Sequence, residues 1–420
     1  MDGKDLRILW FANTPGLSQH YFNSKSTAGG WLSSLQAEIE KSGRCKLGYV
    51  FYSDKKIEPF EFNGTSYFPV QRKAYHKGKR LLYRLAGKTE YDENVGNFLN
   101  IIKIFKPDII NVHGTENSFG LIVNHIADIP VVTTIQGNLT VYAKKYFSGI
   151  KLPGIFSQLM AGSPFFNLDF NQFVKRSKTE REILKKSKYI FGRTDWDRRI
   201  CRVLAPDASY FHIEEIMRPK FYEVKWQPLN NPSPVFFTTS SNSFYKGFET
   251  LIDSASLLTK NNFPFTWMVA GLNENDALVQ LIKKTRRINK LEDIHVKLLG
   301  ELAEEELTDK MIGADIYVQV SHIENSPNSI CEAMLLGMPI IASFAGGTSS
   351  LLKDKETGVL VQDGDPFVLA GGLIEMAKPS STIHDIANQA HCVAHKRHNK
   401  ENIVSHLLAT YIGIIKNHHA

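Results

Sequence analysis

The chain has 420 residues, of which 43% are hydrophobic and 22% charged, and its formal net charge is +7. This balance excludes a disordered or fibrous protein, and the length predicts two to four domains, most simply two. No apolar run reaches the roughly 18 residues of a membrane-spanning helix, no signal-peptide core opens the chain, and the cysteines form no CxxC pair. We therefore expect a cytoplasmic protein without a disulfide framework or a zinc site.

The charge is distributed unevenly along the chain. Residues 1–222 carry 33 Lys and Arg against 21 Asp and Glu, a net of +12, whereas residues 223–420 carry 17 against 22, a net of −5. The excess gathers in two basic clusters, at residues 72–88 and 175–199. The split predicts that only the N-terminal half faces an anionic partner such as lipid headgroups or pyrophosphate.

Short β-branched or aromatic runs alternate with amphipathic stretches, which is the pattern of parallel α/β units. Helical periodicity is clear at Gly30–Lys41 and Asn94–Phe105, among other places. A proline-rich stretch, Pro219–Pro234, divides the pattern into two halves. We expect strands at Arg7–Ala12, Lys46–Tyr52, Asp108–Val112, Val131–Ile135 and Lys188–Gly192, and then at Val235–Thr239, Thr266–Ala270, His295–Leu299, Ile316–Val320, Pro339–Ser343 and Val359–Val361.

These elements predict an α/β protein of two doubly wound, Rossmann-like domains that face a central cleft. We place the first domain at residues 1–222 and the second at residues 223–398. Residues 399–420 contain a last helical pattern, Glu401–Ile415, with no strand after it. This helix is a candidate for packing back onto the first domain.

The strongest motif follows the strand expected at residues 316–320. Residues 321–339 read Ser-His-Ile-Glu-Asn-Ser-Pro-Asn-Ser-Ile-Cys-Glu-Ala-Met-Leu-Leu-Gly-Met-Pro, which puts Glu324 on a strand-to-helix loop and Glu332 in the following helix. Such loops line the ligand crevice of a doubly wound sheet, and a helix start binds pyrophosphate through its free N–H groups. A carboxylate about one turn inside can accept hydrogen bonds from a ribose diol. If the two carboxylates were the whole signal, a surface Glu and a helix-capping Asn would be the better explanation.

With its flanking residues, however, the stretch resembles the E-x7-E signature of the group 1 (family 4) retaining glycosyltransferases of the GT-B fold. Glu324 and Glu332 match the pair, and Ala333-Met334, Gly337 and Pro339 match its continuation. The resemblance implies a metal-independent hexosyltransferase with no cofactor, whose co-substrate is a nucleotide sugar, most simply UDP- or GDP-linked. The first domain would bind the glycan acceptor and the second the donor.

The resemblance also implies roles for single residues. Glu324, beside the donor sugar, and Lys246, which neutralises the diphosphate, are the expected catalytic residues. Glycine at position 29 or 30 would let backbone amides approach a phosphate. The expected donor-binding residues are Glu332, Asn328, Ser329, Ser241, Asn242, Gly346, Gly347, Gly29, Gly30, Arg193 and Arg218, and the expected acceptor-side or cleft residues are His113, Gln136 and Asn138.

The chain departs from the family pattern at two places. Thr239 to Ser243 stand where the family usually has an Arg before its Lys-Gly, so Arg193 or Arg218 would have to supply the missing charge. Gln136 stands where the family tends to have a His, and a Gln cannot act as a base or a cation. Two alternatives stay open: a nucleotide-sugar epimerase of the GT-B fold, and a catalytically degenerate regulator that binds nucleotide sugar.

Two D-x-D matches carry little weight as metal sites. In Asp195-Trp196-Asp197 and Asp363-Gly364-Asp365, we interpret Asp195 and Asp365 as helix caps and expect no metal.

The basic cluster from Arg72 to Lys88 interleaves cations with Tyr and Leu, which suits an anionic membrane surface. The uncharged loop Leu152–Leu168 could add an apolar contact, or could equally cover the core of the first domain. No nucleic-acid motif accompanies the charge, so nucleic acid is not expected. We therefore predict peripheral binding at the inner face of the cell membrane and a lipid-linked glycan acceptor, as in bacterial surface-polysaccharide biosynthesis.

Overall fold

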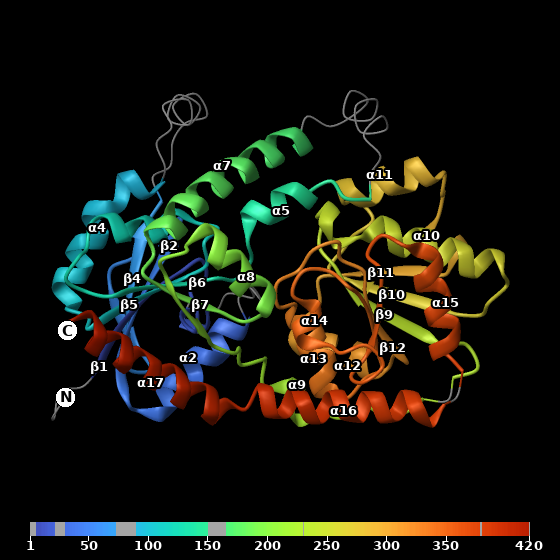
Figure 1. Cartoon of the computed structure of the whole chain (residues 1–420). Helices are drawn as coiled ribbons and strands as arrows, with labels where there is room; N and C mark the ends of the chain where they lie inside the picture. The colour runs from blue at the N-terminus through green and yellow to red at the C-terminus, as the bar shows by residue number, and fades with distance from the viewer. Residues whose placement is uncertain are drawn as a thin grey trace.

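The structure, a computed structural model, describes residues 6–21, 30–72, 90–149, 165–229, 231–378 and 380–419. Within these residues the chain forms two α/β domains, which lie side by side and face each other across the centre of the molecule (Figure 1). Each domain contains one sheet of mainly parallel strands with helices on both faces. The expected fold class, two Rossmann-like domains of the GT-B type, is confirmed.

The first domain is built on a sheet in the order β3-β4-β2-β1-β5-β6-β7-β8, in which only the β3–β4 pair of the described strands is antiparallel. The central strand β1 is fully buried from Ile8 to Ala12, as expected for a parallel strand covered on both faces. The strands are β1 (Leu6–Ala12), β2 (Cys45–Ser53), β3 (Phe60–Phe62), β4 (Thr65–Gln71), β5 (Ile109–His113), β6 (Val131–Thr134), β7 (Tyr189–Gly192) and β8 (Ser209–His212).

Helices cover both faces of this sheet and begin the connection to the second domain. None of the helices in the described ranges is long and apolar enough to cross a membrane. The helical elements of the first half are α1 (Ser18–Tyr21), α2 (Gly30–Ser42), α4 (Glu90–Phe105), the 3-10 helix η1 (Ser118–Asn124), α5 (Leu139–Lys145), α7 (Phe165–Lys186), α8 (Asp195–Leu204) and α9 (Lys220–Glu223).

The second domain has an all-parallel sheet in the order β11-β10-β9-β12-β13-β14. Its strands are β9 (Val235–Thr239), β10 (Thr266–Ala270), β11 (Val296–Gly300), β12 (Ile316–Gln319), β13 (Ile340–Ser343) and β14 (Val359–Val361). Its helical elements are η2 (Phe244–Lys246), α10 (Phe248–Lys260), α11 (Ala277–Arg286), η3 (Leu291–Ile294), α12 (Glu304–Ile312), α13 (Asn328–Leu336), α14 (Thr348–Leu351), α15 (Pro366–Met376) and α16 (Ser381–Arg397), and α17 (Lys400–His418) follows.

Every strand expected from the sequence is present within one or two residues, and three further strands were not expected. The hairpin β3–β4 turns at Asn63-Gly64, where both residues have positive φ, 49° and 81°. An Asn-Gly pair between alternating apolar residues is a strong hairpin signal, which we did not use in the sequence analysis. The third, β8, forms the sheet edge, and its side chains are only partly buried, which weakens its pattern.

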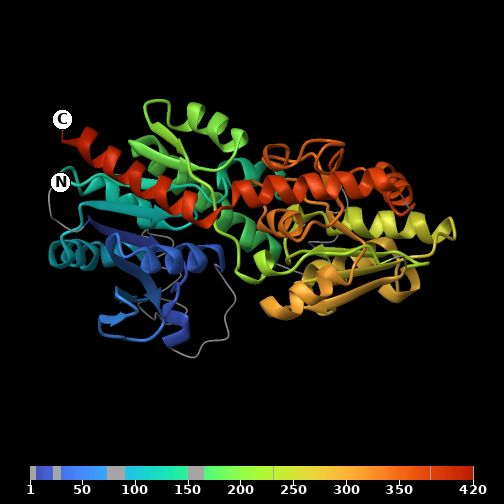
Figure 2. The same cartoon turned by 90° about the horizontal axis from the view of Figure 1, so that it is seen from below.

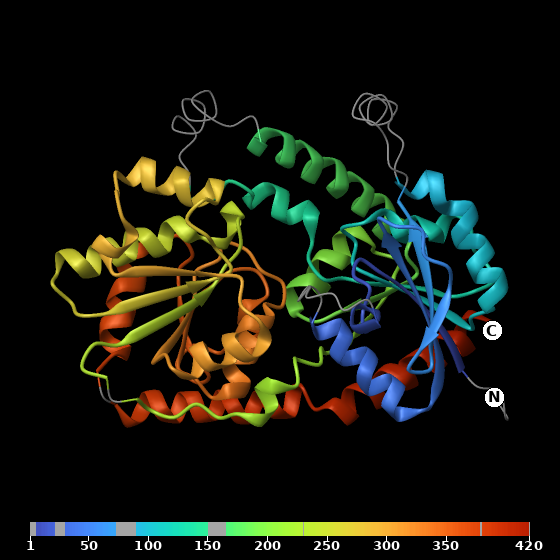
Figure 3. The ribbon, with the colours of Figure 1, turned by 180° about the vertical axis from the view of Figure 1, so that it is seen from behind.

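The chain enters the second domain ahead of α9 and returns to the first domain at its C-terminal helix. Met217 and Phe221 already pack in the core of the second domain, so the first crossing precedes residue 222. At the other end, α16 lies on the second domain and α17 crosses back onto the first, as the views in Figures 2 and 3 show. Tyr411 of α17 is fully buried, and its hydroxyl accepts a 2.7 Å hydrogen bond from Asn111 on β5.

Candidate active site

A cavity of about 500 Å³ lies between the carboxyl ends of the two sheets. This is where doubly wound sheets bind ligands, because the strand-to-helix loops of both domains converge there. The second domain lines it with Thr239, Leu307, Asn328, Ser329 and Glu332, the first domain with Asn13, Thr14, Gly30, Trp31, Glu116 and Gln136, and the crossing segment with Arg218.

Helix α13 brings three of the expected donor-binding residues to the cavity. It begins at Asn328 after Pro327, and no side chain caps its first turn. Asn328 and Ser329 both line the cavity, and the side-chain oxygen of Asn328 has no hydrogen-bond partner within the described residues. Uncapped N–H groups and the positive end of the helix dipole make this end suited to an anion.

Glu332 lies one turn inside α13 and is 4% exposed. Arg218 holds it with two parallel hydrogen bonds, from Nε to Oε1 at 2.7 Å and from Nη2 to Oε2 at 2.8 Å. Burial raises the pKa of Glu332, and the ion pair with Arg218 opposes that rise. Glu332, which we expected to bind a ribose, therefore lies on the cavity wall, but Arg218 is hydrogen-bonded to both of its carboxylate oxygens.

The two expected catalytic residues contact each other. Lys246 Nζ donates a 2.5 Å hydrogen bond to Oε1 of Glu324, which also accepts one from the hydroxyl of Ser321 at 2.8 Å. Burial alone would lower the pKa of Lys246, but Glu324, together with Tyr245 and Tyr317, more than offsets this and the pKa is raised, so the lysine is a cation. Gly247 fixes this arrangement, because its φ is 73° and a Cβ there would lie 2.0 Å from the carbonyl oxygen of Val320.

The glycine turns make room for protein atoms. A Cβ at Gly346 would lie 1.9 Å from the carbonyl oxygen of Glu324, and one at Gly347 would lie 2.0 Å from that of Asn325. Gly30 lies against Arg218, whose Cδ would be 2.9 Å from a Cβ. Gly30 thus leaves space for the side chain of Arg218, whereas we had expected it to leave space for a phosphate. Gly29 lies outside the described residues.

Arg193 is not on the cavity wall. Its side chain is 4% exposed, forms an ion pair with Glu215, and lies over the ring of Trp31 at 4.2 Å. Of the two arginines proposed to replace the missing family cation, only Arg218 reaches the cavity.

His113 is also buried, at 2% exposure, where we had expected it at the cleft edge. Its ring lies between those of Trp10 and Trp31, at 4.5 and 5.9 Å, and neither nitrogen has a hydrogen-bond partner in the described part of the chain. Burial, with a contribution from Arg193, lowers its pKa to about 3. The imidazole is therefore neutral and sits inside the first domain. Sequence position alone could not reveal this burial.

Three other expected residues also make protein contacts, and a fourth is exposed. Gln136 lines the cavity, and its backbone carbonyl oxygen accepts from the side chain of Asn325 at 3.2 Å. Asn138 is fully buried and caps α5, accepting from Val141 N at 3.0 Å. Asn242 is exposed and accepts from Leu278 N at the start of α11, at 3.1 Å. Ser241 is exposed as well, and it does not line the cavity.

Sequence reasoning missed Glu116 and Asn13, which lie just after the neighbouring strands β5 and β1. Asn13 donates a 2.6 Å hydrogen bond to Oε1 of Glu116, and both residues line the cavity. Burial raises the pKa of Glu116. Polar residues just after a parallel strand were the available signal, since the carboxyl edge of the sheet collects them.

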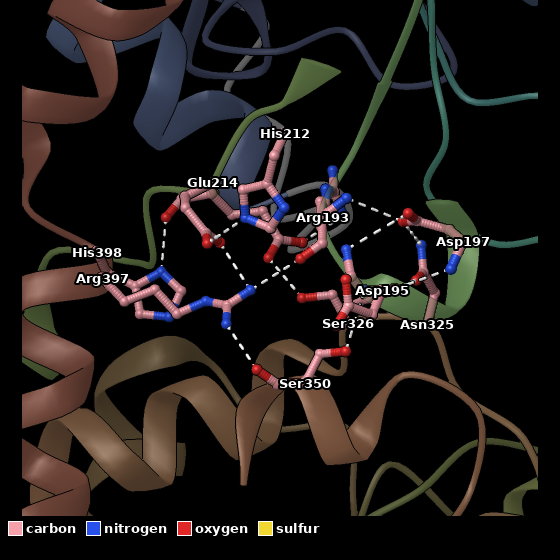
Figure 4. Close-up of polar contacts among 12 residues, drawn as sticks. Arg193, Asp195, Asp197, His212, Glu214, Asn325, Ser326, Ser350, Arg397 and His398 are labelled. Atoms are coloured by element: carbon pink, nitrogen blue, oxygen red, sulfur yellow. Dashed lines mark hydrogen bonds and ion pairs between the residues drawn. The ribbon is translucent and has the colours of Figure 1, made fainter. Parts of the chain in front are cut away.

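A polar network joins the domains directly beside the Glu324 loop (Figure 4). Asn325 Nδ2 donates to Asp197 Oδ2 at 3.0 Å, and its Oδ1 accepts from Thr194 Oγ1 at 2.6 Å. Ser326 donates to Glu215 at 2.8 Å. Thr194, rather than Asp195 as we had interpreted, caps α8, and Asp197 completes its capping box. These residues are committed to the interface between the domains.

Within the described residues, no group of three or more His, Cys, Asp or Glu side chains could hold a metal ion. Asp365 caps α15, accepting hydrogen bonds from Phe367 N and Val368 N, which explains one of the two D-x-D matches.

Comparisons with known proteins agree with this arrangement. Residues 223–392 match the family model of glycosyl transferases group 1. The chain is 26% identical over 144 residues to the amylovoran biosynthesis glycosyltransferase AmsK of Erwinia amylovora, a match that covers 33% of this chain and 34% of that protein. The chain thus spans about a third of that relative's length.

Solved structures resemble the chain over nearly its whole length. Sucrose-phosphate synthase of Thermosynechococcus elongatus has a TM-score of 0.72 at 15% identity, covering 98% of this chain and all of that one. HepE of Anabaena, solved with UDP and glucose, has a TM-score of 0.63 at 18% identity, covering 96% and 99%. At such identities the likeness concerns the fold. Residues 223–392 therefore carry the pattern of group 1 glycosyl transferases, in a chain whose two Rossmann-like domains have the GT-B arrangement.

Proposed function

We propose that this protein is a retaining, metal-independent glycosyltransferase of family 4, which moves a hexose from a nucleotide sugar to a carbohydrate acceptor. The observation that carries the proposal is the cavity between the sheets, where the uncapped start of α13, Glu332 and Arg218 meet on one wall. A nucleoside diphosphate offers what those groups bind, a ribose diol and a double anion. The match of residues 223–392 to group 1 glycosyl transferases supports the same reaction class.

In this mechanism the second domain holds the donor. Glu332 binds the ribose, the α13 amides and Lys246 bind the diphosphate, and Glu324 orients the transferred sugar. The bond between the anomeric carbon and the diphosphate breaks while the acceptor oxygen bonds on the same face, and the acceptor proton passes to the departing phosphate. Because no side chain stands out as a nucleophile, this front-face displacement depends chiefly on stabilising the leaving group.

The donor is most simply UDP- or GDP-linked, and HepE, solved with UDP and glucose, supports a uridine nucleotide. A thermal-shift screen with UDP, GDP, ADP and CMP tests donor binding. A ligand at 100 times its dissociation constant should stabilise the protein by about 2.7 kcal/mol. Failure of all four nucleotides to bind would contradict the proposal.

Incubation with the matching labelled nucleotide sugar then identifies the reaction. Transfer to an added glycan supports the glycosyltransferase. An epimer formed without any acceptor would indicate the epimerase instead, and binding with neither hydrolysis nor transfer would indicate the regulator.

For the acceptor, we propose a lipid-linked glycan at the cytoplasmic face of the cell membrane, in surface-polysaccharide biosynthesis. The support is the +12 charge of residues 1–222 and the similarity to AmsK, a glycosyltransferase of amylovoran biosynthesis. Residues 73–88 of the basic cluster and residues 152–164 of the uncharged loop lie outside the described residues, and residues 165–168, which we had expected in that loop, begin helix α7.

Vesicle sedimentation tests membrane binding. Binding should require anionic lipid and weaken with salt, and changing Lys73, Lys77, Lys79 and Arg80 to Glu should abolish it. Binding that is absent at low salt, or unchanged in this variant, would favour a soluble acceptor.

A further inference from the structure

Arg218 occupies an unusual position in the cavity. Among the described residues that line the cavity, it is the single Lys or Arg. It comes from the segment that crosses between the domains, directly before α9, and its side chain is 18% exposed. It therefore meets the cavity with an edge accessible to solvent, while its guanidinium group is bound to Glu332 through two hydrogen bonds.

This pairing conflicts with a ribose at Glu332. A ribose diol that donates both hydroxyls to one carboxylate uses the edge between its two oxygens, and the forked arginine occupies that edge. For the diol to bind there, the arginine must leave when the nucleotide enters.

The diphosphate needs positive charge beyond that of Lys246, whose ammonium group it would share with Glu324. Arg193 is sealed in its pair with Glu215, and Lys246 is paired with Glu324. Arg218 can be freed by the ligand itself, since the ribose hydroxyls that displace it take over the hydrogen bonds to Glu332.

We infer that Arg218 exchanges partners on donor binding: it neutralises Glu332 in the empty cavity and turns to the donor's diphosphate when the ribose takes its place. This inference rests on the proposed function, in that the cavity accepts a nucleoside diphosphate. After the exchange the guanidinium faces the diphosphate anion, and the carboxylate of Glu332 keeps two hydrogen bonds through the ribose hydroxyls, so no buried charged group loses its hydrogen bonds.

The neighbours of Arg218 are a glycine, an aromatic ring and a single acid. Gly30 lies against its aliphatic stem, and any side chain at that position would clash with Cδ and Cγ, at 2.9 and 3.0 Å from a Cβ. The guanidinium carbon lies 4.8 Å from the centre of the Phe221 ring. No described acid other than Glu332 forms an ion pair with Arg218.

The consequence is specificity for diphosphates. A nucleoside must displace Arg218 from Glu332 but carries no phosphate to which the arginine could bind. A nucleoside diphosphate displaces it and then binds it, through charge-assisted hydrogen bonds that are the stronger kind. Arg218 thus acts as a specificity-determining residue, which penalises nucleosides and favours nucleotides that carry phosphate.

Isothermal titration calorimetry with a nucleoside and its diphosphate tests the exchange, using uridine and UDP, or guanosine and GDP if the screen selects that base. In Arg218→Met we expect UDP to bind on the order of tenfold more weakly, the scale of a lost charged hydrogen bond. Uridine should bind as well as to the wild type or better, so the ratio of the two affinities falls.

Arg286→Met is the matched control. Arg286 makes the same forked pair with Asp253, at 2.7 and 2.8 Å, on helices α10 and α11 and outside the cavity. Both affinities should stay at their wild-type values in this variant. Arg218→Lys keeps the charge but loses the fork, and should keep part of the preference for UDP, which provides the same test if Arg218→Met does not fold.

The outcomes separate the inference from the function on which it rests. Unchanged affinities in Arg218→Met, or equal losses for uridine and UDP, would mean that the arginine is a static support of Glu332 and would overturn the exchange. In both cases UDP still binds the wild type, so the proposed function stands. If the wild type binds neither UDP nor GDP, the proposed function fails and the exchange fails with it.

Discussion

Two buried Arg–Glu pairs flank the cleft, and they differ in what surrounds them. The side chains of Arg193 and Glu215 are 4% and 1% exposed, those of Arg218 and Glu332 are 18% and 6% exposed, and only the second pair lines the cavity. Trp31 covers the guanidinium of Arg193, and Ser326 of the other domain bonds to Glu215. The first pair joins the domains, and the second faces the space between them.

The difference shows what decides whether an arginine is available to a ligand. In the sequence, Arg193 and Arg218 are equivalent candidates for a diphosphate cation. A charge sealed in protein depends on its partner, because nothing else compensates it, whereas a charge on a cavity wall can be compensated by water or by a ligand. Four predictions test this contrast.

The largest effect should come from Glu215→Ala. This change leaves the cation of Arg193 buried without its partner, which typically costs about 3–5 kcal/mol. We expect the free energy of unfolding in urea to fall by that amount. A loss below about 1 kcal/mol, the scale of an exposed pair, would show that water reaches this site and that the contrast with Arg218 is wrong.

Glu324→Gln extends the comparison to the Lys246–Glu324 pair. We expect turnover to fall on the order of a hundredfold, the effect typical of one preorganised electrostatic group. Nucleotide affinity should stay at its wild-type value, because we propose that Glu324 contacts the sugar and not the nucleotide. Steady-state kinetics with the labelled donor, together with titration of UDP or GDP, measures both quantities. Equal losses of nucleotide and sugar-nucleotide binding would show that the role is misassigned.

Glu332→Ala should mainly weaken nucleotide binding, by about 1.5–3 kcal/mol for a lost charged hydrogen-bond acceptor. Its effect on stability should be smaller than that of Glu215→Ala, because Arg218 lies at the cavity. Calorimetric titration and urea unfolding of the same protein test both statements. Unchanged nucleotide affinity in a folded variant would refute the ribose assignment.

The smallest effect is expected for Asn138→Ala, which removes the cap of α5 and gives a baseline for a structural residue. Loss of an N-cap costs about 1 kcal/mol, so the free energy of unfolding should fall by that amount and nucleotide affinity should not change. If the free energy of nucleotide binding falls by more than the free energy of unfolding, Asn138 contacts the ligand and belongs with the cleft residues.

Much of the second domain could be predicted because its signals are local. The run from Ser321 to Pro339 follows the end of β12 and contains a loop and the whole of α13 in one continuous stretch. Backbone geometry alone therefore brings Asn328, Ser329 and Glu332 to the carboxyl edge of the sheet. The first domain offered weaker signals: the Asn63-Gly64 hairpin was overlooked, and Glu116 lies on a wall that only the packing of β1 against β5 defines.

The sequence by itself determined the alternation of strands and helices, the division into two Rossmann-like domains, and the position of the E-x7-E stretch, since periodicity and strand-to-helix spacing depend on neighbours in the chain. Only the tertiary structure decided that His113 is enclosed by two tryptophans, that Arg193 is sealed while Arg218 faces the cavity, and that α17 returns to the first domain. Burial and ion pairing depend on residues far apart in the sequence: 114 residues separate Arg218 from Glu332, and their contact exists because the crossing segment around α9 packs against α13.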